Sequence, residues 1–422
     1  MASQSFMAMA MAGEVGAATT VPGAPGCPMF PADNVWNTPI SSLPVNAQSS
    51  TWLASMDASG TFLHPDFGPS GDPSTPYGIP FTVVPAGHPF VGISFQYADE
   101  SDPGPYPFGP DTPIEGGQDA TGDRHAIMVD PATCTLYELY DASYSASGST
   151  AGSGAIWNLR SNALRPAGWT SADAAGLPIL PGLVDYDEVA SGSMDHAIRF
   201  TAECSQDAFI WPARHEAGQA DAACPPLGAR FRLDASFTLP ASLCSPMCQT
   251  VIATLKNYGL ILADNGSNWY FQGTADTRWT DTDVDQLKQI PASAFQAVDE
   301  SSLMVNADSG QAVQPNPPAP PATVVQPTST TTVVRAPTTT TVIPPPPPTT
   351  VAPAIAHGPR LPDGPRGEAG GAASSGALLP GSGGAGKGHE HGLSSLVWLA
   401  ISLGLLAVVG AACAVRARRH IG

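Results

Sequence analysis

Two histidines that head similar segments are the first candidates for chemistry. Residues 121–130 read TGDRHAIMVD and residues 194–201 read MDHAIRFT, so an acid, a histidine and a strand-like tail occur twice. Alternate residues of a strand share a face, which places His125 and His196 each at the start of the apolar face of its strand. Such a histidine can act as an acid or base in a cleft, or can be a structural residue bonded to a carboxylate or carbonyl.

Carboxylates near strand ends would complete an acid–base site. Asp123 precedes His125 by two residues and can share its face and orient its ring, whereas Asp195 points to the opposite face from His196. Glu115 is followed by two glycines, which leave its surroundings open. Glycoside cleavage needs a pair of carboxyl groups beside the bond, although carboxylates in such turns also serve as caps or calcium ligands. We predict catalytic roles for His125, His196, Glu115 and Asp123.

The segment WPARH at 211–215 combines groups that suit a sugar ligand. An indole can stack on a sugar ring, and a guanidinium can bind its hydroxyl or carboxylate groups. The alternative is a tryptophan that closes the core beside a salt-bridged arginine. The predicted substrate-binding residues are Trp211, Arg214, His215 and Trp169.

No metal, cofactor or nucleic acid is predicted. The spacing of His125, His196 and His215 fits no metal-ligand signature. The sequence has no nucleophile elbow, phosphate loop or dinucleotide fingerprint. Nucleic-acid binding needs a basic surface, whereas the formal net charge is −19 and the globular part carries no basic stripe.

Composition divides the 422 residues into unlike parts. We expect residues 1–26 to be the remnant of an export signal or disordered, and residues 27–305 to form one globular extracellular domain. Residues 306–392 are rich in Pro and Thr and then in Gly and Ser, which predicts a disordered linker. The uncharged run 393–415 has the length of a transmembrane helix, and the basic residues 416–422 predict a cytoplasmic tail.

The attachment to the cell surface has two possible forms. A single-pass membrane protein with its N-terminal domain outside is the simpler expectation. The sequence LPGSG at 379–383 is similar to the LPxTG signal of sortases, with Ser382 in the position of threonine. Cleavage there would instead join the protein to the cell wall.

Six of the seven cysteines lie in the globular part, which favours export and disulfides over a zinc site. Six cysteines allow 15 pairings, so the connectivity is open. The preferred pairs are Cys244 with Cys248, Cys204 with Cys224, and by elimination Cys27 with Cys134.

Short strand-like runs between Gly, Pro and Asp predict a mainly β fold, a single large β-sandwich-like domain with a few accessory helices. The sequence LILADNGSNWYF at 260–271 predicts a hairpin because Asn-Gly favours a type I′ turn. Helices are expected around 49–56, 246–259 and 281–290. Residues 160–188 carry three prolines without a strand period and predict a long, functional or tightly packed loop.

Several segments resemble a family of secreted or cell-surface proteins of actinobacteria and other soil bacteria. They are GDRHAIMVD, LRPAGWTSADAAGLPILPGLVDYDE, HAIRFT, WPARH and ADNGSNWYFQG, together with FPADNVWNTPI and YADESDPGPYP. The resemblance covers nearly the whole globular part. It implies export and the extent of the domain, and it implies no particular activity.

Exposed aromatics and acids in an exported β-rich domain favour a carbohydrate ligand. The first hypothesis is a surface-anchored protein that binds, and in its stronger form hydrolyses, an extracellular polysaccharide or cell-wall glycan by acid–base catalysis. The rival hypothesis is a non-catalytic adhesin or structural protein of the cell surface. Convergence of the predicted site residues in one pocket would favour the enzyme.

Overall fold

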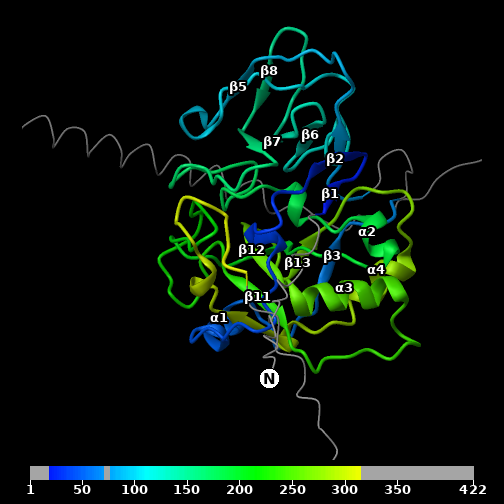
Figure 1. Ribbon diagram of the computed structural model, residues 1–422, viewed down its shortest axis with the longest axis vertical. Coiled ribbons are helices and arrows are strands. Elements are labelled where there is room, and N and C mark those ends of the chain that lie inside the picture. Colours follow the sequence, from blue (N-terminus) through cyan, green and yellow to red (C-terminus); the bar gives the residue numbers. More distant parts are fainter. Residues whose placement is uncertain (1–18, 71–76, 315–422) are drawn as a thin grey trace, which may run out of the picture. The chain divides into compact units, whose positions relative to one another are not determined.

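A six-stranded mixed sheet carries the largest core, and β10 lies near its middle, between β12 and β13. Figure 1 labels these two neighbouring strands. The computed structural model describes residues 19–70 and 77–314. The strand order of this sheet is β14-β11-β12-β10-β13-β3. Its strands are β3 (His64–Asp66), β10 (Ile198–Ala202), β11 (Arg230–Leu233), β12 (Leu260–Asn265), β13 (Tyr270–Gln272) and β14 (Phe295–Val298). β10 and most of β12 are buried, as their nearly continuous apolar sequences require.

A four-stranded sheet, in the order β4-β6-β7-β9, is buried on both faces. From β6, Ile127 and Val129 enter the main core, whereas Ala126 and Met128 enter a second core. Alternation along the strand therefore joins the two cores through one sheet. Its strands are β4 (Phe81–Val83), β6 (Ala126–Asp130), β7 (Thr135–Tyr140) and β9 (Ser153–Asn158).

Two short pairs of strands complete the β structure of the described residues. One pair is antiparallel and the other parallel. They are β1 (Thr20–Val21) with β2 (Ala24–Pro28), and β5 (Ile93–Phe95) with β8 (Ser149–Ala151).

Three predicted helices are confirmed, and a fourth, which was not predicted, begins within the last three residues of the expected loop 160–188. The α-helices are α1 (Ser49–Ser55), α2 (Tyr186–Ser191), α3 (Pro246–Asn257) and α4 (Asp281–Leu287). The 3-10 turns are η1 (Val35–Asn37), η2 (Ala98–Glu100), η3 (Leu180–Gly182), η4 (Ala292–Ala294) and η5 (Ser301–Leu303). The short helix α2 forms because Asp185 caps it by accepting hydrogen bonds from two backbone N–H groups.

The hairpin predicted across Asn265 and Gly266 is wrong. β10 lies between β12 and β13, parallel to the first and antiparallel to the second. Between β12 and β13 the positive φ belongs to Trp269, at 64°, whose indole is fully buried and donates a hydrogen bond to the Met56 carbonyl. Burial of this large side chain outweighs the local preference of the Asn-Gly turn.

The mainly β class is confirmed, and the finer expectation of a sandwich stays a prediction.

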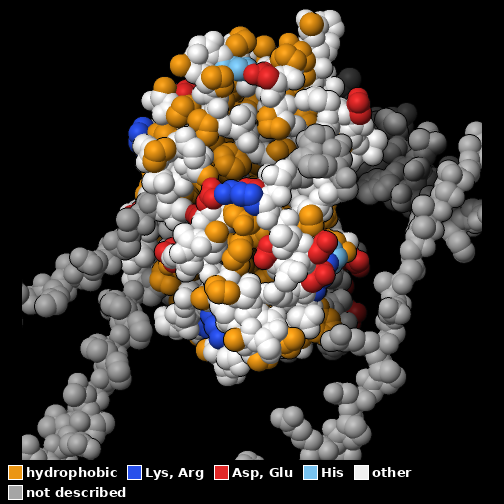
Figure 2. Space-filling view, turned by 90° about the vertical axis from the view of Figure 1, so that its right-hand side faces the viewer, with side chains coloured by type: hydrophobic (Ala, Val, Ile, Leu, Met, Phe, Trp, Pro, Cys, Tyr) orange, Lys and Arg blue, Asp and Glu red, His pale blue; other side chains and the backbone are white. Residues whose placement is uncertain are grey.

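All three preferred cysteine pairs are confirmed as disulfides, Cys27–Cys134, Cys204–Cys224 and Cys244–Cys248. Figure 2 shows acidic side chains beside basic ones near the middle of one face, between apolar areas.

Ordered structure reaches slightly beyond the predicted domain limits. It includes β1 before residue 27 and a backbone hydrogen bond from Ala312 to Asp33 after residue 305. The predicted transmembrane helix, the LPGSG sequence and most of the predicted linker lie outside the described residues. Within 19–70 and 77–314, no helix has the length and apolarity to cross a membrane.

Candidate functional site

Two adjoining cavities, of about 280 and about 390 Å³, share Asp123, Asp264 and Asn265 in their walls. We call the first the Arg199 cavity and the second the Tyr97 cavity, because Arg199 lines only the first and Tyr97 lines only the second. The Arg199 cavity is also lined by Glu115 and His125. Segments far apart in the sequence therefore converge here: the residues before β6, the middle of β10, the end of β12 and the loop around residue 173.

His125 and Glu115 form a close pair in the wall of the Arg199 cavity. The Nδ1 atom of His125 lies 2.6 Å from Oε2 of Glu115, and its Nε2 lies 3.0 Å from the Ala172 carbonyl oxygen. A carbonyl only accepts, so Nε2 carries a proton and donates it there. The His125 side chain is 5% exposed and that of Glu115 is 30% exposed, so the carboxylate faces the cavity with the imidazole behind it.

The pair favours the ionised form of both groups. Burial raises the pKa of Glu115, but the hydrogen bond and positive charge of His125 outweigh it, so its pKa lies below the ordinary value. Burial lowers the pKa of His125, but the Glu115 carboxylate reverses the shift, so its pKa is raised. Glu115 is therefore held as a carboxylate by an imidazolium.

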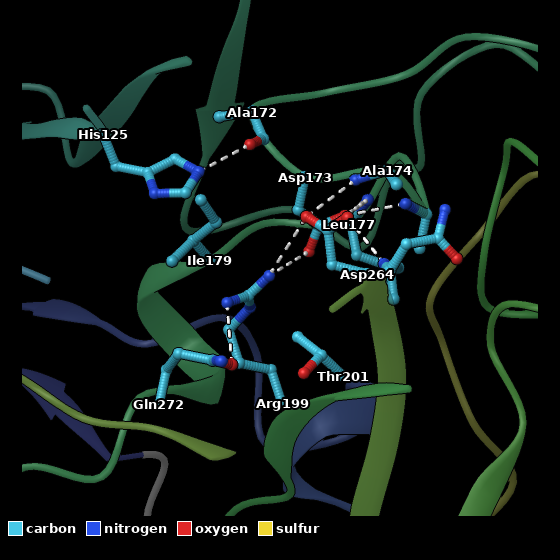
Figure 3. Close-up of polar contacts among 12 residues, drawn as sticks. His125, Ala172, Asp173, Ala174, Leu177, Ile179, Arg199, Thr201, Asp264 and Gln272 are labelled. Atoms are coloured by element: carbon cyan, nitrogen blue, oxygen red, sulfur yellow. Dashed lines mark hydrogen bonds and ion pairs between the residues drawn. The ribbon is translucent and has the colours of Figure 1, made fainter. Parts of the chain in front are cut away.

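The buried Arg199 forms ion pairs with two aspartates. Figure 3 shows Asp173, Asp264 and Gln272 directed toward the guanidinium of Arg199. Nη2 of Arg199 lies 3.5 Å from Oδ2 of Asp173 and 3.6 Å from Oδ2 of Asp264, and Nη1 donates to Gln272 at 2.9 Å. Arg199 is 2% exposed and the Asp173 side chain is fully buried, whereas the Asp264 side chain is 26% exposed and reaches both cavities.

Both aspartates retain a proton more readily than an exposed aspartate. Burial raises the pKa of Asp173, the Arg199 guanidinium opposes the rise, and the Asp264 carboxylate adds to it. Burial likewise raises the pKa of Asp264, against the charges of Arg199 and His125. Since one guanidinium serves both carboxylates, the two groups titrate as a pair.

Tyrosines, rather than the predicted tryptophans, supply the aromatic surface of the cavities. Tyr97 and Tyr140 line the Tyr97 cavity, and Tyr97 is 45% exposed. Tyr270 lines the Arg199 cavity and stacks on His64 with ring centroids 4.0 Å apart. The phenol of Tyr77 donates a hydrogen bond to Asp66, which also lines the Arg199 cavity.

His196 lies apart from this site. Its Nε2 is 2.9 Å from Oε2 of Glu188 and its Nδ1 is 2.8 Å from the Ala197 carbonyl oxygen. It lines a small cavity of about 10 Å³ with Glu188, and none of the residues that line it also line the Arg199 or the Tyr97 cavity. The structure does not bring the two predicted histidines together.

The four predicted substrate-binding residues are also dispersed. His215 lines the Tyr97 cavity, where its Nε2 is 3.6 Å from Oε2 of Glu100. Arg214 is buried and donates to the carbonyls of Arg165 and Ala307. Trp211 lines a different cavity and donates to the Ser309 carbonyl.

Trp169 lines neither the Arg199 nor the Tyr97 cavity, and the centroid of its ring lies 5.5 Å from the Arg165 guanidinium. Of the residues predicted to bind substrate, His215 alone reaches either cavity.

Arg199, Asp173, Asp264 and Tyr97 were missed by the sequence reasoning. Two signals were available: a charged residue inside the apolar strand HAIRFT, and an aspartate that ends the apolar run LILAD. A charge in a buried strand needs a partner, which marks Arg199 and Asp264 as members of one cluster.

The described residues contain one converging group of potential metal ligands, Cys204, Asp221 and Cys224. Both sulfurs belong to one disulfide, so neither is available as a thiolate ligand.

No protein-family model matches this chain, and no curated protein and no solved structure is significantly similar to it. The functional assignment therefore depends on the chemistry of the cavities.

Proposed function

We propose that this protein binds an extracellular polysaccharide in the two adjoining cavities and hydrolyses it by acid–base catalysis. One observation carries the proposal: Glu115 and Asp264 line the same cavity, and their surroundings move their pKa values in opposite directions. Surroundings that move the pKa values of two carboxyl groups apart in this way mark one group as an acid and the other as a base or nucleophile.

The roles follow from the two environments. Asp264, which retains its proton to higher pH, donates it to the oxygen of the leaving sugar. Glu115, which stays ionised, either removes a proton from the attacking water or attacks the anomeric carbon itself. In both versions water supplies a hydroxyl to one product and a proton to the other. His125 holds Glu115 ionised and in place, so it is a positioning residue.

The shape and lining of the site favour a chain of sugars over a single small molecule. The cavities adjoin at Asp123 and Asp264, so consecutive sugar units can occupy both. Tyr97 and Tyr270 offer ring surfaces in separate cavities, and Asn265 adds an amide at the junction. Aromatic faces with polar groups between them suit sugar rings and their hydroxyls.

The place of action is the outer surface of the cell. Three disulfides favour an oxidising compartment. The apolar run 393–415 with its basic tail is proposed to anchor the domain through the linker, as a single-pass membrane protein or after processing at LPGSG. A polysaccharide outside the cell or in its wall is then the substrate within reach.

A glycan panel tests the proposal. Purified full-length protein is incubated with extracellular and cell-wall polysaccharides, and new reducing ends are counted. Asp264→Asn and Glu115→Gln each lower the rate at least about 100-fold if their carboxyl groups act as proposed. Asp119→Asn is the matched control, because Asp119 is an exposed acid of the same loop as Glu115 and lines neither cavity.

Each outcome has a defined meaning. Cleavage that survives both Asp264→Asn and Glu115→Gln contradicts the proposed site. Specific glycan binding without any cleavage contradicts the hydrolase and favours the non-catalytic adhesin.

A further inference from the structure

The walls of the two cavities carry more acidic than basic side chains. The positive or ionisable nitrogen groups are one arginine and two histidines, Arg199, His125 and His215. The acids are Asp66, Glu100, Glu115, Asp123, Asp173 and Asp264. No lysine lines either cavity. The raised pKa values of Asp173 and Asp264 favour their neutral forms, but the four acids that remain still outnumber the three nitrogen groups, so the site attracts positive charge.

Each positive group is already engaged by the protein. Arg199 is shared between Asp173 and Asp264, His125 is paired with Glu115, and Nε2 of His215 lies 3.6 Å from Glu100. These pairs neutralise part of the acidic set. None of them involves Asp123.

Asp123 carries the least compensated charge at the site. It is exposed, lines both cavities at their junction, and its carboxylate makes no hydrogen bond or ion pair with any residue in the described ranges. The neighbouring Arg124 cannot neutralise it easily, because its guanidinium donates to the carbonyls of Gln118, Ala120 and Ala142. A cation bound at the junction would therefore face a carboxylate without a competing partner.

Buried atoms in the walls of the two cavities point to a ligand that also carries hydroxyl groups. Nε and Nη2 of Arg199 and Oδ2 of Asp173 have no hydrogen-bond partner among the described residues, and Nη2 meets Oδ2 only in their ion pair at 3.5 Å. Both side chains are nearly or fully buried. Arg199 and Asp173 line the Arg199 and Tyr97 cavities respectively. A hydroxyl can accept from the guanidinium and donate to the carboxylate, which satisfies both kinds of atom.

We propose that the polysaccharide taken by this site is cationic, with free amino sugars whose ammonium group binds beside Asp123. This inference depends on the proposed function and deepens it by naming the substrate class. An amino sugar offers an ammonium group to the Asp123 carboxylate. It also offers hydroxyl groups to the buried atoms of Arg199 and Asp173 that have no hydrogen-bond partner. A neutral glycan offers the second feature alone, and an anionic glycan is repelled by the acids.

Three oligosaccharides of equal length test the inference, since they differ only at carbon 2 of each β-1,4-linked unit. They are the glucosamine oligomer with free amines, its N-acetylated form and the glucose oligomer. Binding to the full-length protein is measured at mildly acidic pH, where amines are protonated and exposed aspartates remain ionised. We expect the glucosamine oligomer to bind at least about tenfold more tightly than the glucose oligomer, with a ratio that falls as salt rises.

The variants separate the role of Asp123 from net charge. Asp123→Asn is expected to reduce the preference for the glucosamine oligomer about tenfold, whereas Asp119→Asn, which removes the same charge elsewhere, keeps it. Circular dichroism of Asp123→Asn confirms folding, and Asp123→Glu, which restores the charge, is expected to restore most of the preference.

The possible failures are distinguishable. Equal or tighter binding of the glucose or N-acetylated oligomer, or a preference that survives Asp123→Asn, overturns the cationic substrate and leaves the proposed hydrolase standing. Binding of none of the three oligomers also overturns the inference. If in addition no glycan of the wider panel is bound or cleaved, the proposed function fails with it.

Discussion

Glu115 and His125 are joined three times: the side chains meet at 2.6 Å, the Glu115 backbone N–H donates to the His125 carbonyl at 2.9 Å, and the His125 backbone N–H donates to Oε2 of Glu115 at 3.4 Å. These links fix a carboxylate from the glycine-rich loop against the start of β6. The pair thus connects the stability of the fold with the ionisation of the proposed base.

Glu115→Gln is expected to destabilise the protein by about 1–3 kcal/mol. The pKa of Glu115 is lowered, so its contribution is complete above the pKa of an unfolded glutamate and is lost as pH falls through the folded value. The pKa of His125 is raised, so its contribution is complete below the pKa of an unfolded histidine and is lost as pH rises through the folded value. Denaturant titrations of the wild type and of Glu115→Gln at several pH values measure the two free energies of unfolding. They should differ most between the pKa of an unfolded glutamate and that of an unfolded histidine. A difference independent of pH would contradict the ion pair.

Glu188→Gln is a matched test of the second histidine. The substitution removes the charged partner of His196, and the His196 residue is 3% exposed. We expect it to lower the free energy of unfolding by about 1–3 kcal/mol. The His196 pKa is raised, with burial opposed by the Glu188 carboxylate, so this loss should shrink as pH rises through that pKa. Glycan turnover should remain within about twofold of wild type, because His196 lines a separate cavity. A loss of turnover as large as that of Glu115→Gln would place His196 in the mechanism.

Tyr97→Ala is expected to weaken glycan binding by about 0.5–1.5 kcal/mol, the usual contribution of one stacked aromatic ring. The phenol is 45% exposed at the Tyr97 cavity, so folding should be little affected. Phe62→Ala is the control, since Phe62 is 54% exposed and lines neither cavity. Calorimetry with the best glycan of the panel measures both variants, and equal effects would remove Tyr97 from the binding surface.

The disulfides are expected to contribute unequally. Cys27–Cys134 spans 107 residues and Cys244–Cys248 spans 4. Loop-closure entropy predicts that replacing the first pair by alanine costs about 5 kcal/mol and replacing the second about 2 kcal/mol. Chemical denaturation of the two double variants measures the difference. An equal loss would show that strain or residual structure, rather than loop length, sets the contribution.

Local patterns predicted the elements whose partners are close in the sequence. The helix α3 begins with the Ser245 cap and Pro246 and is followed by Gly259 at a φ of 69°, all readable as start and stop signals. The separation of β12 from β13 was not readable, because the strand that lies between them, β10, is some 60 residues away in the sequence. Long-range strand insertion overrides a turn signal when it buries a side chain such as Trp269.

The candidate site could be predicted only in part for the same reason. Glu115, His125 and Asp123 lie within eleven residues, and Asp123 was identified from its spacing to His125 and Glu115 from the two glycines that follow it. Asp173, Arg199 and Asp264 come from three distant segments, and each alone looks like an ordinary charged residue. They can be recognised as members of one site only because they are buried beside one another, and no local sequence pattern encodes that proximity.

The dependence of turnover on pH tests the central claim most directly, since it reports the two carboxyl groups in the working protein. With the best glycan of the panel, kcat/KM should be bell-shaped. Its acid limb should lie below the pKa of an ordinary glutamate, because the pKa of Glu115 is lowered, and its alkaline limb above that of an ordinary aspartate, because the pKa of Asp264 is raised. Asp264→Asn should abolish the alkaline limb along with most of the rate. A profile that keeps this limb and its rate in Asp264→Asn would contradict the account.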